Sequence, residues 1–273
     1  MRLTWPLTGR NEELAAIDAA MSDPDSSGVV LHGAAGVGKS RIAREALARA
    51  AGAGSTTHWA VGTASARALP LGALTAWMTA EMDGPQLVRL MVDALTTTSH
   101  GAAVIVGVDD VHLLDDLSAF VLHQIARRRT AKLVLTLRDG ETVPPGVQEI
   151  WAAGEFHRID LQPLSADETA GLLSVTLGGT VDPGAGHRLW SLTRGNVLYL
   201  HHMVEQEVSA GRLAPDDGCW RWAGGMTVAP ALVELIESRM GALPPAVGDV
   251  IDSLAVGEPM DIRSLTDITD PAA

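Results

Sequence analysis

At 273 residues, the chain is long enough for one full α/β domain and for one or two smaller helical units. With 47% apolar and 19% charged residues, its composition excludes an intrinsically disordered protein. The formal net charge is -13 and the only lysines are Lys39 and Lys132, which excludes a lysine-rich nucleic-acid surface because an acidic protein repels phosphate backbones. A local arginine cluster is the one feature of this chain that could contact DNA. Otherwise we expect DNA contact only through regions outside this chain.

The cysteine content and the apolar runs predict a cytoplasmic protein. Cys219 is the only cysteine, so no intramolecular disulfide can form. The longest apolar run, residues 102–108, is far shorter than the roughly 18 to 20 residues that a membrane-spanning helix needs. The N-terminal segment also lacks the apolar core of a signal peptide. We expect no membrane partner.

The first part of the chain alternates predicted helices and strands. Apolar residues recur at helical spacing over residues 11–21, with Asn11 as the expected N-cap. Turn residues 23–28 lead into a strand over residues 29–31, and a helix is expected over residues 40–51. Further strands are expected over residues 59–62, 104–108, 133–137 and 157–161, further helices over residues 71–82, 86–97 and 117–129, and a turn at residues 144–146. This alternation predicts a mostly parallel sheet with helices on both faces.

The pattern becomes mainly helical after residue 161, which we expect to end an α/β domain over residues 1–161. Ser165 and Glu168 form a capping box at the start of a helix over residues 165–177. Further helices are expected over residues 187–193, 197–210 and 230–241, with a hairpin near residues 211–227. These elements predict a helical lid-type domain over residues 162–242. Residues 243–273, with a helix from Ala246, begin another segment, and we expect the sequence to be a fragment of a longer protein.

Residues 33–40 carry the strongest chemical signal. They match the Walker A pattern G-x-x-x-x-G-K-S/T in full, between a predicted strand and a predicted helix. In this motif the glycine-rich backbone and the helix N-terminus hold phosphates, the lysine reaches the β and γ phosphates, and the serine ligates Mg²⁺. The expected nucleotide-binding residues are Gly33, Ala34, Ala35, Gly36, Val37, Gly38, Lys39, Ser40 and Arg41, with Lys39 also catalytic. The motif predicts binding of ATP with Mg²⁺, against the alternative of a chance glycine turn.

Two acidic residues, Asp109 and Asp110, follow the apolar strand over residues 104–108 in a Walker B pattern. Open parallel sheets bind ligands at the carboxyl ends of their strands. Asp109 is the expected Mg²⁺ ligand beside Ser40, and Asp110 is expected to orient or deprotonate the attacking water. Taken alone, a capped turn or a helix start with solvated acids explains the pair equally well. The phosphate loop upstream favours the metal-binding interpretation.

A threonine and an arginine, Thr136 and Arg138, end the strand over residues 133–137. A guanidinium can bind two phosphate oxygens at once and loses that contact on hydrolysis. The pair therefore predicts a sensor of the γ phosphate in which Arg138 reports the nucleotide state. Spacing alone favours the alternative, an ordinary surface arginine at a strand end.

These motifs together resemble the STAND branch of the AAA+ ATPases, and more closely the nucleotide-binding domain of large ATP-binding LuxR-type bacterial regulators. The resemblance covers nearly the whole chain. It is carried by residues 7–14, by the two Walker motifs with the Walker B form D-D-V-H, by T-x-R at residues 136–138, and by residues 161–168, 194–200 and 239–244.

The resemblance implies a P-loop NTPase fold of the AAA+/STAND type, a smaller helical domain and the start of a winged-helix domain. It implies ATP or ADP and Mg²⁺ as cofactors, with Thr8, Gly9 and Arg10 near the adenine and Pro163 lining the base. The sequence departs from the family pattern at Val197, where the family has proline, and at Asp110, where many AAA+ enzymes have glutamate. The shorter Asp110 side chain predicts slow turnover.

We therefore expect a slow ATPase that acts as a switch module of a LuxR-family transcriptional regulator, with nucleotide state controlling domain packing or oligomerisation. A homo-oligomer is compatible with this function. The main alternative is an AAA+ motor or loader that acts on DNA, and a P-loop kinase or a module that binds nucleotide as structural glue are weaker alternatives. The preference for ATP over GTP, the signal ligand, the target genes and the oligomeric state stay open.

Overall fold

The computed structural model describes residues 3–79, 86–98, 101–224 and 245–257. The chain divides into two compact units, Met1–Gly224 and Gly225–Ala273. In the described part of the chain, no helix is both long and apolar enough to cross a membrane.

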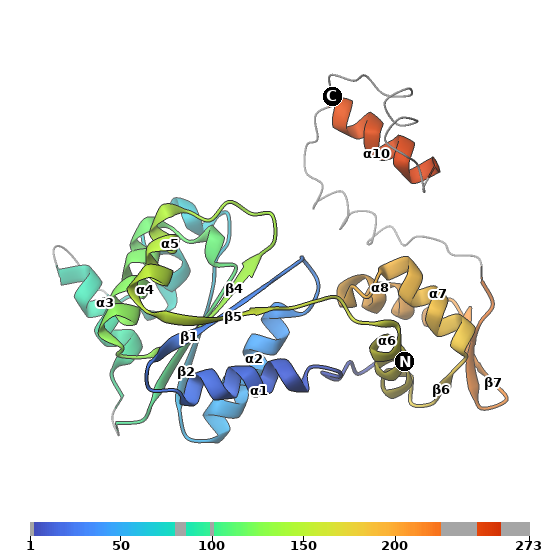
Figure 1. The fold of residues 1–273 in the computed structure, drawn as a ribbon, viewed down its shortest axis with the longest axis horizontal. Coiled ribbons are helices and arrows are strands. Elements are labelled where there is room, and N and C mark those ends of the chain that lie inside the picture. The colour runs from blue at the N-terminus through green and yellow to red at the C-terminus, as the bar shows by residue number, and fades with distance from the viewer. Residues whose placement is uncertain (1–2, 80–85, 99–100, 225–244, 258–273) are drawn as a thin grey trace. The chain divides into compact units, whose positions relative to one another are not determined.

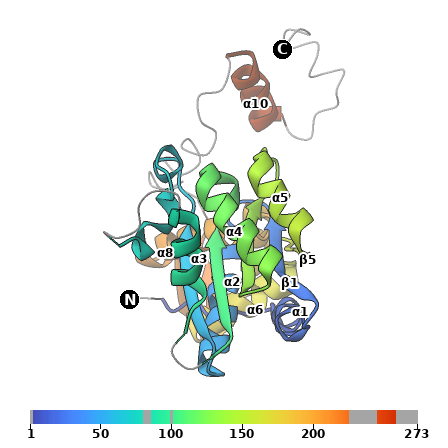
Figure 2. The same cartoon turned by 90° about the vertical axis from the view of Figure 1, so that its left-hand side faces the viewer.

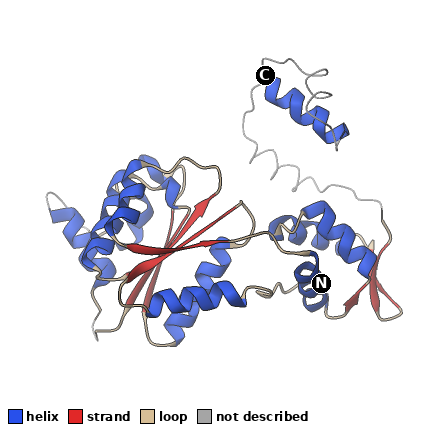
Figure 3. Ribbon diagram, viewed as in Figure 1, coloured by secondary structure: helices blue, strands red, loops and turns tan. Residues whose placement is uncertain are grey.

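A five-stranded parallel sheet is the centre of the first unit (Figures 1 and 3). Its strands are β1 (Ser26–Gly33), β2 (Thr56–Val61), β3 (Val104–Asp109), β4 (Lys132–Arg138) and β5 (Glu155–Asp160). The spatial order is β2-β3-β4-β1-β5, and every neighbouring pair is parallel. All five strands therefore end at the same edge, where β1 runs into the predicted phosphate loop.

Helices cover both faces of this sheet, as predicted (Figures 1 and 2). One face packs against α1 (Asn11–Ser22) and α2 (Lys39–Gly52), and the other against α3 (Leu87–Thr96), α4 (Asp116–Arg128) and α5 (Pro145–Ala153). Successive side chains of a strand point to opposite faces. Accordingly, Val29 and Leu31 of β1 join the α1–α2 core while Val30 joins the α3–α5 core. This double burial explains why the strands read as continuous apolar runs in the sequence.

Three local predictions in this part of the chain were wrong. The N-cap of α1 is Arg10, so Asn11 is the first helical residue and caps nothing. Strand β1 begins at Ser26, so the second half of the expected turn over residues 23–28 is extended. Helix α5 begins at Pro145, within the turn expected at residues 144–146, and Pro144 is its N-cap. Pro145 sits in the first turn, where its missing N–H and fixed φ favour helix initiation.

The segment over residues 71–82 also differs from the expected α-helix. Its described part contains a 3₁₀-helix, η2 (Gly72–Trp77). Buried Leu71 and Leu74, followed by the partly buried Trp77, recur every three residues, which fits the three-residue turn of a 3₁₀-helix as well as an α-helix. The carboxylate of Asp115 at the N-cap of α4 accepts the N–H groups of Leu71 and Gly72 and so fixes the start of η2. This contact could not be read from local sequence.

Residues beyond β5 form a helical part with its own hydrophobic core. Its helices are α6 (Ala166–Leu177), α7 (Pro183–Thr193) and α8 (Val197–Ser209). The capping box of Ser165 and Glu168 at the start of α6 is confirmed. Helix α7 starts four residues before the expected position, because Asp182 caps it and Pro183 occupies its first turn. Leu161 belongs to the core of the sheet and Leu164 to the helical core, although the predicted boundaries of 1–161 and 162–242 stay predictions.

A small sheet completes the helical part. Strands β7 (Leu213–Asp216) and β8 (Cys219–Trp222) form the expected antiparallel hairpin. The short strand β6 (Thr180–Val181) was not predicted and pairs in parallel with β8. Residues 225–227 of the expected hairpin lie outside the described residues.

The second unit contains one described helix, α10 (Pro245–Gly257), close to the expected start at Ala246. The expected helix over residues 230–241 and most of the segment that resembles a winged-helix start lie outside the described residues.

Candidate nucleotide-binding site

The phosphate loop connects β1 to α2 at the carboxyl edge of the sheet. Gly33, Gly36 and Gly38 have φ values of 153°, 86° and 103°, a region that other residues rarely adopt. At Gly33, a Cβ atom would lie 2.6 Å from the carbonyl oxygen of Leu161, so only glycine fits there. Helix α2 begins at Lys39 without a side-chain cap, which leaves its first N–H groups for an anion. The loop therefore fits the phosphates of a nucleotide.

Lys39 lies inside this loop and is 6% exposed. Its Nζ donates hydrogen bonds to the carbonyl oxygens of Gly33, at 2.7 Å, and Ala34, at 2.8 Å. Burial lowers the pKa of Lys39 from its ordinary value, and the nearby Asp110 carboxylate partly offsets this shift. The ammonium group is therefore held in the loop by neutral carbonyl groups, and a phosphate would supply the counter-charge that they lack.

The two predicted magnesium ligands are in contact. Ser40 Oγ donates a hydrogen bond of 2.8 Å to Asp109 Oδ1, and Asp109 is 9% exposed at the end of β3. Mg²⁺ in nucleotide sites is commonly held by one or two protein ligands together with phosphate oxygens and water. This arrangement matches that donor set. Among the described residues, no group of three or more His, Cys, Asp or Glu side chains forms a metal site independent of phosphate.

The two predicted catalytic residues beyond the loop, Asp110 and Arg138, form an ion pair. Arg138 donates from its terminal nitrogen to Asp110 Oδ2 at 2.7 Å and from Nε to Oδ1 at 3.2 Å. The Asp110 side chain is 18% exposed and the Arg138 side chain is 35% exposed. Asp110, the predicted base, and Arg138, the predicted phosphate sensor, are therefore hydrogen-bonded to each other.

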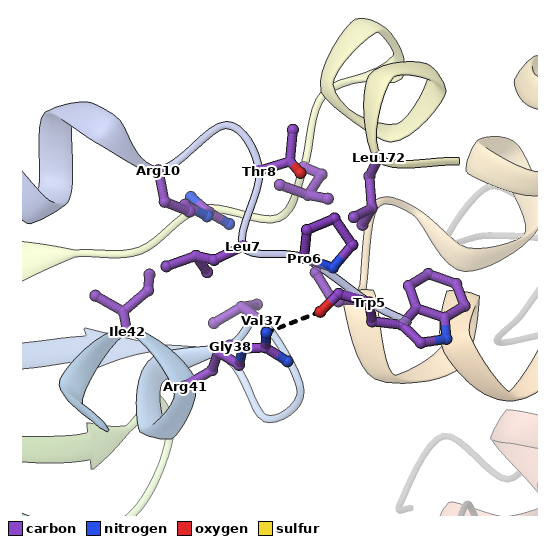
Figure 4. Close-up of a pocket in the computed structure, with 12 residues that line it drawn as sticks. Trp5, Pro6, Leu7, Thr8, Arg10, Val37, Gly38, Arg41, Ile42 and Leu172 are labelled. Atoms are coloured by element: carbon purple, nitrogen blue, oxygen red, sulfur yellow. Dashed lines mark hydrogen bonds between the residues drawn. The ribbon is translucent and has the colours of Figure 1, made fainter. Parts of the chain in front are cut away.

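A small pocket lies beside the phosphate loop at the start of α2 (Figure 4). It is lined by Trp5, Pro6, Leu7, Thr8, Arg10, Val37, Gly38, Arg41, Ile42, Leu164, Leu172 and Val197. Its volume of about 80 Å³ is well below the roughly 300 Å³ or more of typical small-molecule sites.

Of the residues predicted to lie near the base, some line the pocket and others do not. Thr8 and Arg10 line the pocket, but the buried guanidinium of Arg10 is bound to Glu13 and to the carbonyl oxygen of Gln162, both at 2.6 Å. Pro163 is exposed and is not among the lining residues, whereas the next residue along the chain is. Arg41 donates a 2.8 Å hydrogen bond to the carbonyl oxygen of Trp5 and so ties the N-terminal segment to α2 (Figure 4).

The start of α8 contacts the tip of the phosphate loop, which the sequence did not predict. Asn196 Nδ2 donates to the carbonyl oxygen of Ala35 at 2.8 Å, and the N–H of Leu198 donates to the carbonyl oxygen of Gly36 at 3.2 Å. A Cβ atom on Gly36 would lie 2.5 Å from Asn196 Oδ1. Gly36 therefore permits the helical part to touch the loop directly.

Known proteins share this fold. Residues 6–137 match the family model of the AAA ATPase domain. No curated protein matches the sequence. This part of the chain is therefore similar to an AAA ATPase domain, and it includes both Walker motifs at the sheet edge.

Solved structures of three proteins carry the same fold. The Aeropyrum pernix ORC1 protein in complex with DNA aligns over 97% of this chain and 77% of its own, with a TM-score of 0.57 and 16% identity. Thermotoga maritima RuvB aligns over 94% and 79%, with a TM-score of 0.51 and 14% identity. S. cerevisiae Hsp104 in complex with casein aligns over 77% of this chain and 39% of its own, with a TM-score of 0.53 and 18% identity. These similarities confirm the predicted P-loop AAA+ α/β fold.

Proposed function

We propose that this chain is the ATP-binding, slowly ATP-hydrolysing switch module of a LuxR-family transcriptional regulator in the cytoplasm. The observation that carries the proposal is the direct contact between the phosphate loop and α8, through Asn196 and Leu198. A nucleotide that changes the conformation of the loop would also change these hydrogen bonds to α8. ATP or ADP with Mg²⁺ is the proposed ligand, and nucleotide state would control how the helical part packs on the sheet or how copies of the chain assemble.

Ser40 and Asp109 would hold Mg²⁺, which would neutralise phosphate charge when bound. Lys39 would exchange its two carbonyl partners for phosphate oxygens, and charge-assisted bonds are the stronger ones. The loop carbonyl groups would then lose their lysine partner. The phosphate loop would thus differ between its free and bound forms where it borders α8.

The Asp110–Arg138 pair supports the switch. A γ phosphate would compete with Asp110 for the Arg138 guanidinium, since both are anions that bind it through two oxygens. Release of Arg138 would leave the Asp110 carboxylate able to accept a proton from the attacking water. ADP lacks the γ phosphate, so the pair would form again after hydrolysis. Catalysis would be slow because the base is short and starts out paired.

The small pocket beside the phosphate loop, which is the proposed base site, supports coupling to the helical part. Leu164, Leu172 and Val197 come from the helical side of the pocket and Ile42 from the sheet domain. Since the pocket volume of about 80 Å³ is below that of typical small-molecule sites, binding of a base there would move these two sides apart. The same movement would change the contact of α8 with the phosphate loop.

The central test is the affinity of the purified chain for ATP, ADP and GTP with and without Mg²⁺, measured by calorimetry, beside single-turnover hydrolysis. We expect Mg²⁺-dependent ATP binding and steady-state turnover well below the roughly 1 to 100 s⁻¹ of efficient phosphoryl-transfer enzymes. Absence of nucleotide binding would refute the proposal.

The alternative is an AAA+ motor or loader that acts on DNA. It stays open because one structural neighbour, the ORC1 protein, was solved in complex with DNA. The formal net charge of -13 argues against an extended DNA-binding surface on this chain. A tenfold increase in turnover on addition of double- or single-stranded DNA at moderate salt would favour the motor over the switch.

Replacing Asn196 tests the coupling of the loop to α8. Asn196→Asp keeps the side-chain oxygen that caps Leu198 and Tyr199 but removes the amide donor to Ala35. We expect ATP affinity to change by less than about fivefold, which corresponds to one hydrogen bond, while ATP and ADP no longer give different proteolysis patterns beyond Leu161. Asn196→Ala, which also removes the cap, is the comparison for helix destabilisation. A nucleotide-dependent pattern like that of the wild type in Asn196→Asp would contradict the coupling.

A further inference from the structure

Thr136 joins the two Walker B acids through one hydroxyl group. The side chain is fully buried near the end of β4. Its Oγ1 donates a 2.6 Å hydrogen bond to Asp109 Oδ1 and accepts a 2.8 Å hydrogen bond from the backbone N–H of Asp110. The paired register of β3 and β4 ends at Val108 and Leu135, so this hydroxyl continues the connection of the two strands beyond the ladder.

This geometry leaves no donor for a phosphate. A threonine hydroxyl has one hydrogen, and Asp109 accepts it. Thr136 is also 0% exposed, so no phosphate reaches it in this arrangement. The sensing role predicted for the Thr136–Arg138 pair therefore falls to Arg138 alone in our interpretation.

The two bonds act on the two acids in different ways. At Asp109 the hydroxyl holds the carboxylate itself, at the same oxygen that accepts from Ser40. At Asp110 it holds the backbone, which has the left-handed conformation with φ 49° and ψ 55°. That conformation is uncommon for a residue other than glycine and needs support from its surroundings. With the backbone held there, the Asp110 side chain meets Arg138.

We propose that Thr136 is a positioning residue for the magnesium–triphosphate site: its hydroxyl orients the Asp109 carboxylate toward the metal and fixes the backbone that directs Asp110. The proposal rests on the proposed ATP-binding function. Ser40 Oγ would have to turn its lone pairs toward a metal and so change its bond to Asp109, whereas the fully buried Thr136 hydroxyl would keep its bond to Asp109. Threonine suits this position because its branched side chain has few rotamers in a strand.

The test compares Thr136→Val with Thr136→Ser. Valine has nearly the same shape without the hydroxyl, and serine restores the hydroxyl with a less restricted rotamer. The measurement is ATP affinity by calorimetry in a Mg²⁺ titration and, separately, with EDTA. We expect Thr136→Val to raise the Mg²⁺ concentration for half-maximal effect about tenfold, as found for groups that orient metal ligands. Affinity without Mg²⁺ should change less than about twofold, and Thr136→Ser should recover most of the loss.

Thr176→Val is the matched control, since Thr176 is also buried but its hydroxyl has no hydrogen-bond partner among the described residues. It should leave the Mg²⁺ titration unchanged. If Thr136→Val does not fold, Thr136→Cys takes its place, because a thiol is a weak donor and acceptor and should give an intermediate shift. A folded Thr136→Val variant with the wild-type Mg²⁺ titration would overturn the positioning role. Wild-type protein that binds no Mg²⁺–ATP would instead overturn the ATP-binding function itself.

Discussion

Lys39→Ala should weaken ATP binding by about 1.5 to 3 kcal/mol without unfolding the protein, because it removes a charge-assisted contact to phosphate. The shape of the loop depends mainly on Gly33, Gly36 and Gly38 and on the α8 contact, so most of it should survive the loss of the lysine. Calorimetry would measure the affinity, and circular dichroism would show whether the fold is kept.

The other lysine of the chain provides a control. Lys132 lies at the start of β4 and donates hydrogen bonds to the carbonyl oxygens of Asp23 and Ser26, at the opposite edge of the sheet from the phosphate loop. Burial lowers the pKa of Lys132, as it does for Lys39. Lys132→Ala should therefore reduce stability and leave ATP affinity unchanged. Unchanged ATP affinity in a folded Lys39→Ala variant would refute the phosphate-loop assignment.

Asp110→Asn should slow single-turnover ATP hydrolysis by about 10²- to 10⁴-fold, the usual contribution of a general base. ATP affinity should stay close to that of the wild type, because the amide keeps the size of the side chain and does not touch the predicted metal ligands. Loss of the Asp110 charge also weakens the hold on Arg138, which becomes more available to a γ phosphate. The variant should therefore accumulate in the ATP-bound form, visible as an altered proteolysis pattern beyond Leu161.

Two further variants separate binding from hydrolysis and from signalling. Asp109→Asn should lose both hydrolysis and the Mg²⁺-dependent part of ATP affinity, because it weakens a metal ligand. In the Asp110→Asn background, replacement of Arg138 by alanine should return the proteolysis pattern toward that of the ADP form while ATP stays bound. Wild-type hydrolysis in Asp110→Asn would exclude Asp110 as the base, and identical digestion of all variants under ATP and ADP would show that nucleotide does not control packing.

Local chemistry was sufficient to predict several parts of this protein. The phosphate loop is recognisable because its backbone needs glycine at fixed positions, between an apolar strand and a helix. The central strands are recognisable because a strand buried on both faces must be continuously apolar, as in β3 and β4. The start of α6 is recognisable because a capping box satisfies helix N–H groups within four residues. Each of these signals depends on neighbours in the sequence.

The contacts that give the candidate site its proposed properties were decided only by the tertiary structure. Asp110 and Arg138 are 28 residues apart in the chain, and Asn196 is 161 residues from Ala35. The first pair meets because the strand order β2-β3-β4-β1-β5 places β3 beside β4, and the second because the helical part folds back against the loop. The sequence predicted a joint sensing role for Thr136 and Arg138 and a separate catalytic role for Asp110, but the hydrogen bonds that both make to Asp110 depend on strand order and on the left-handed turn at Asp110. Residue spacing carries no information about which strands become neighbours, so it could not show that the predicted base, Asp110, and the predicted sensor, Arg138, form an ion pair.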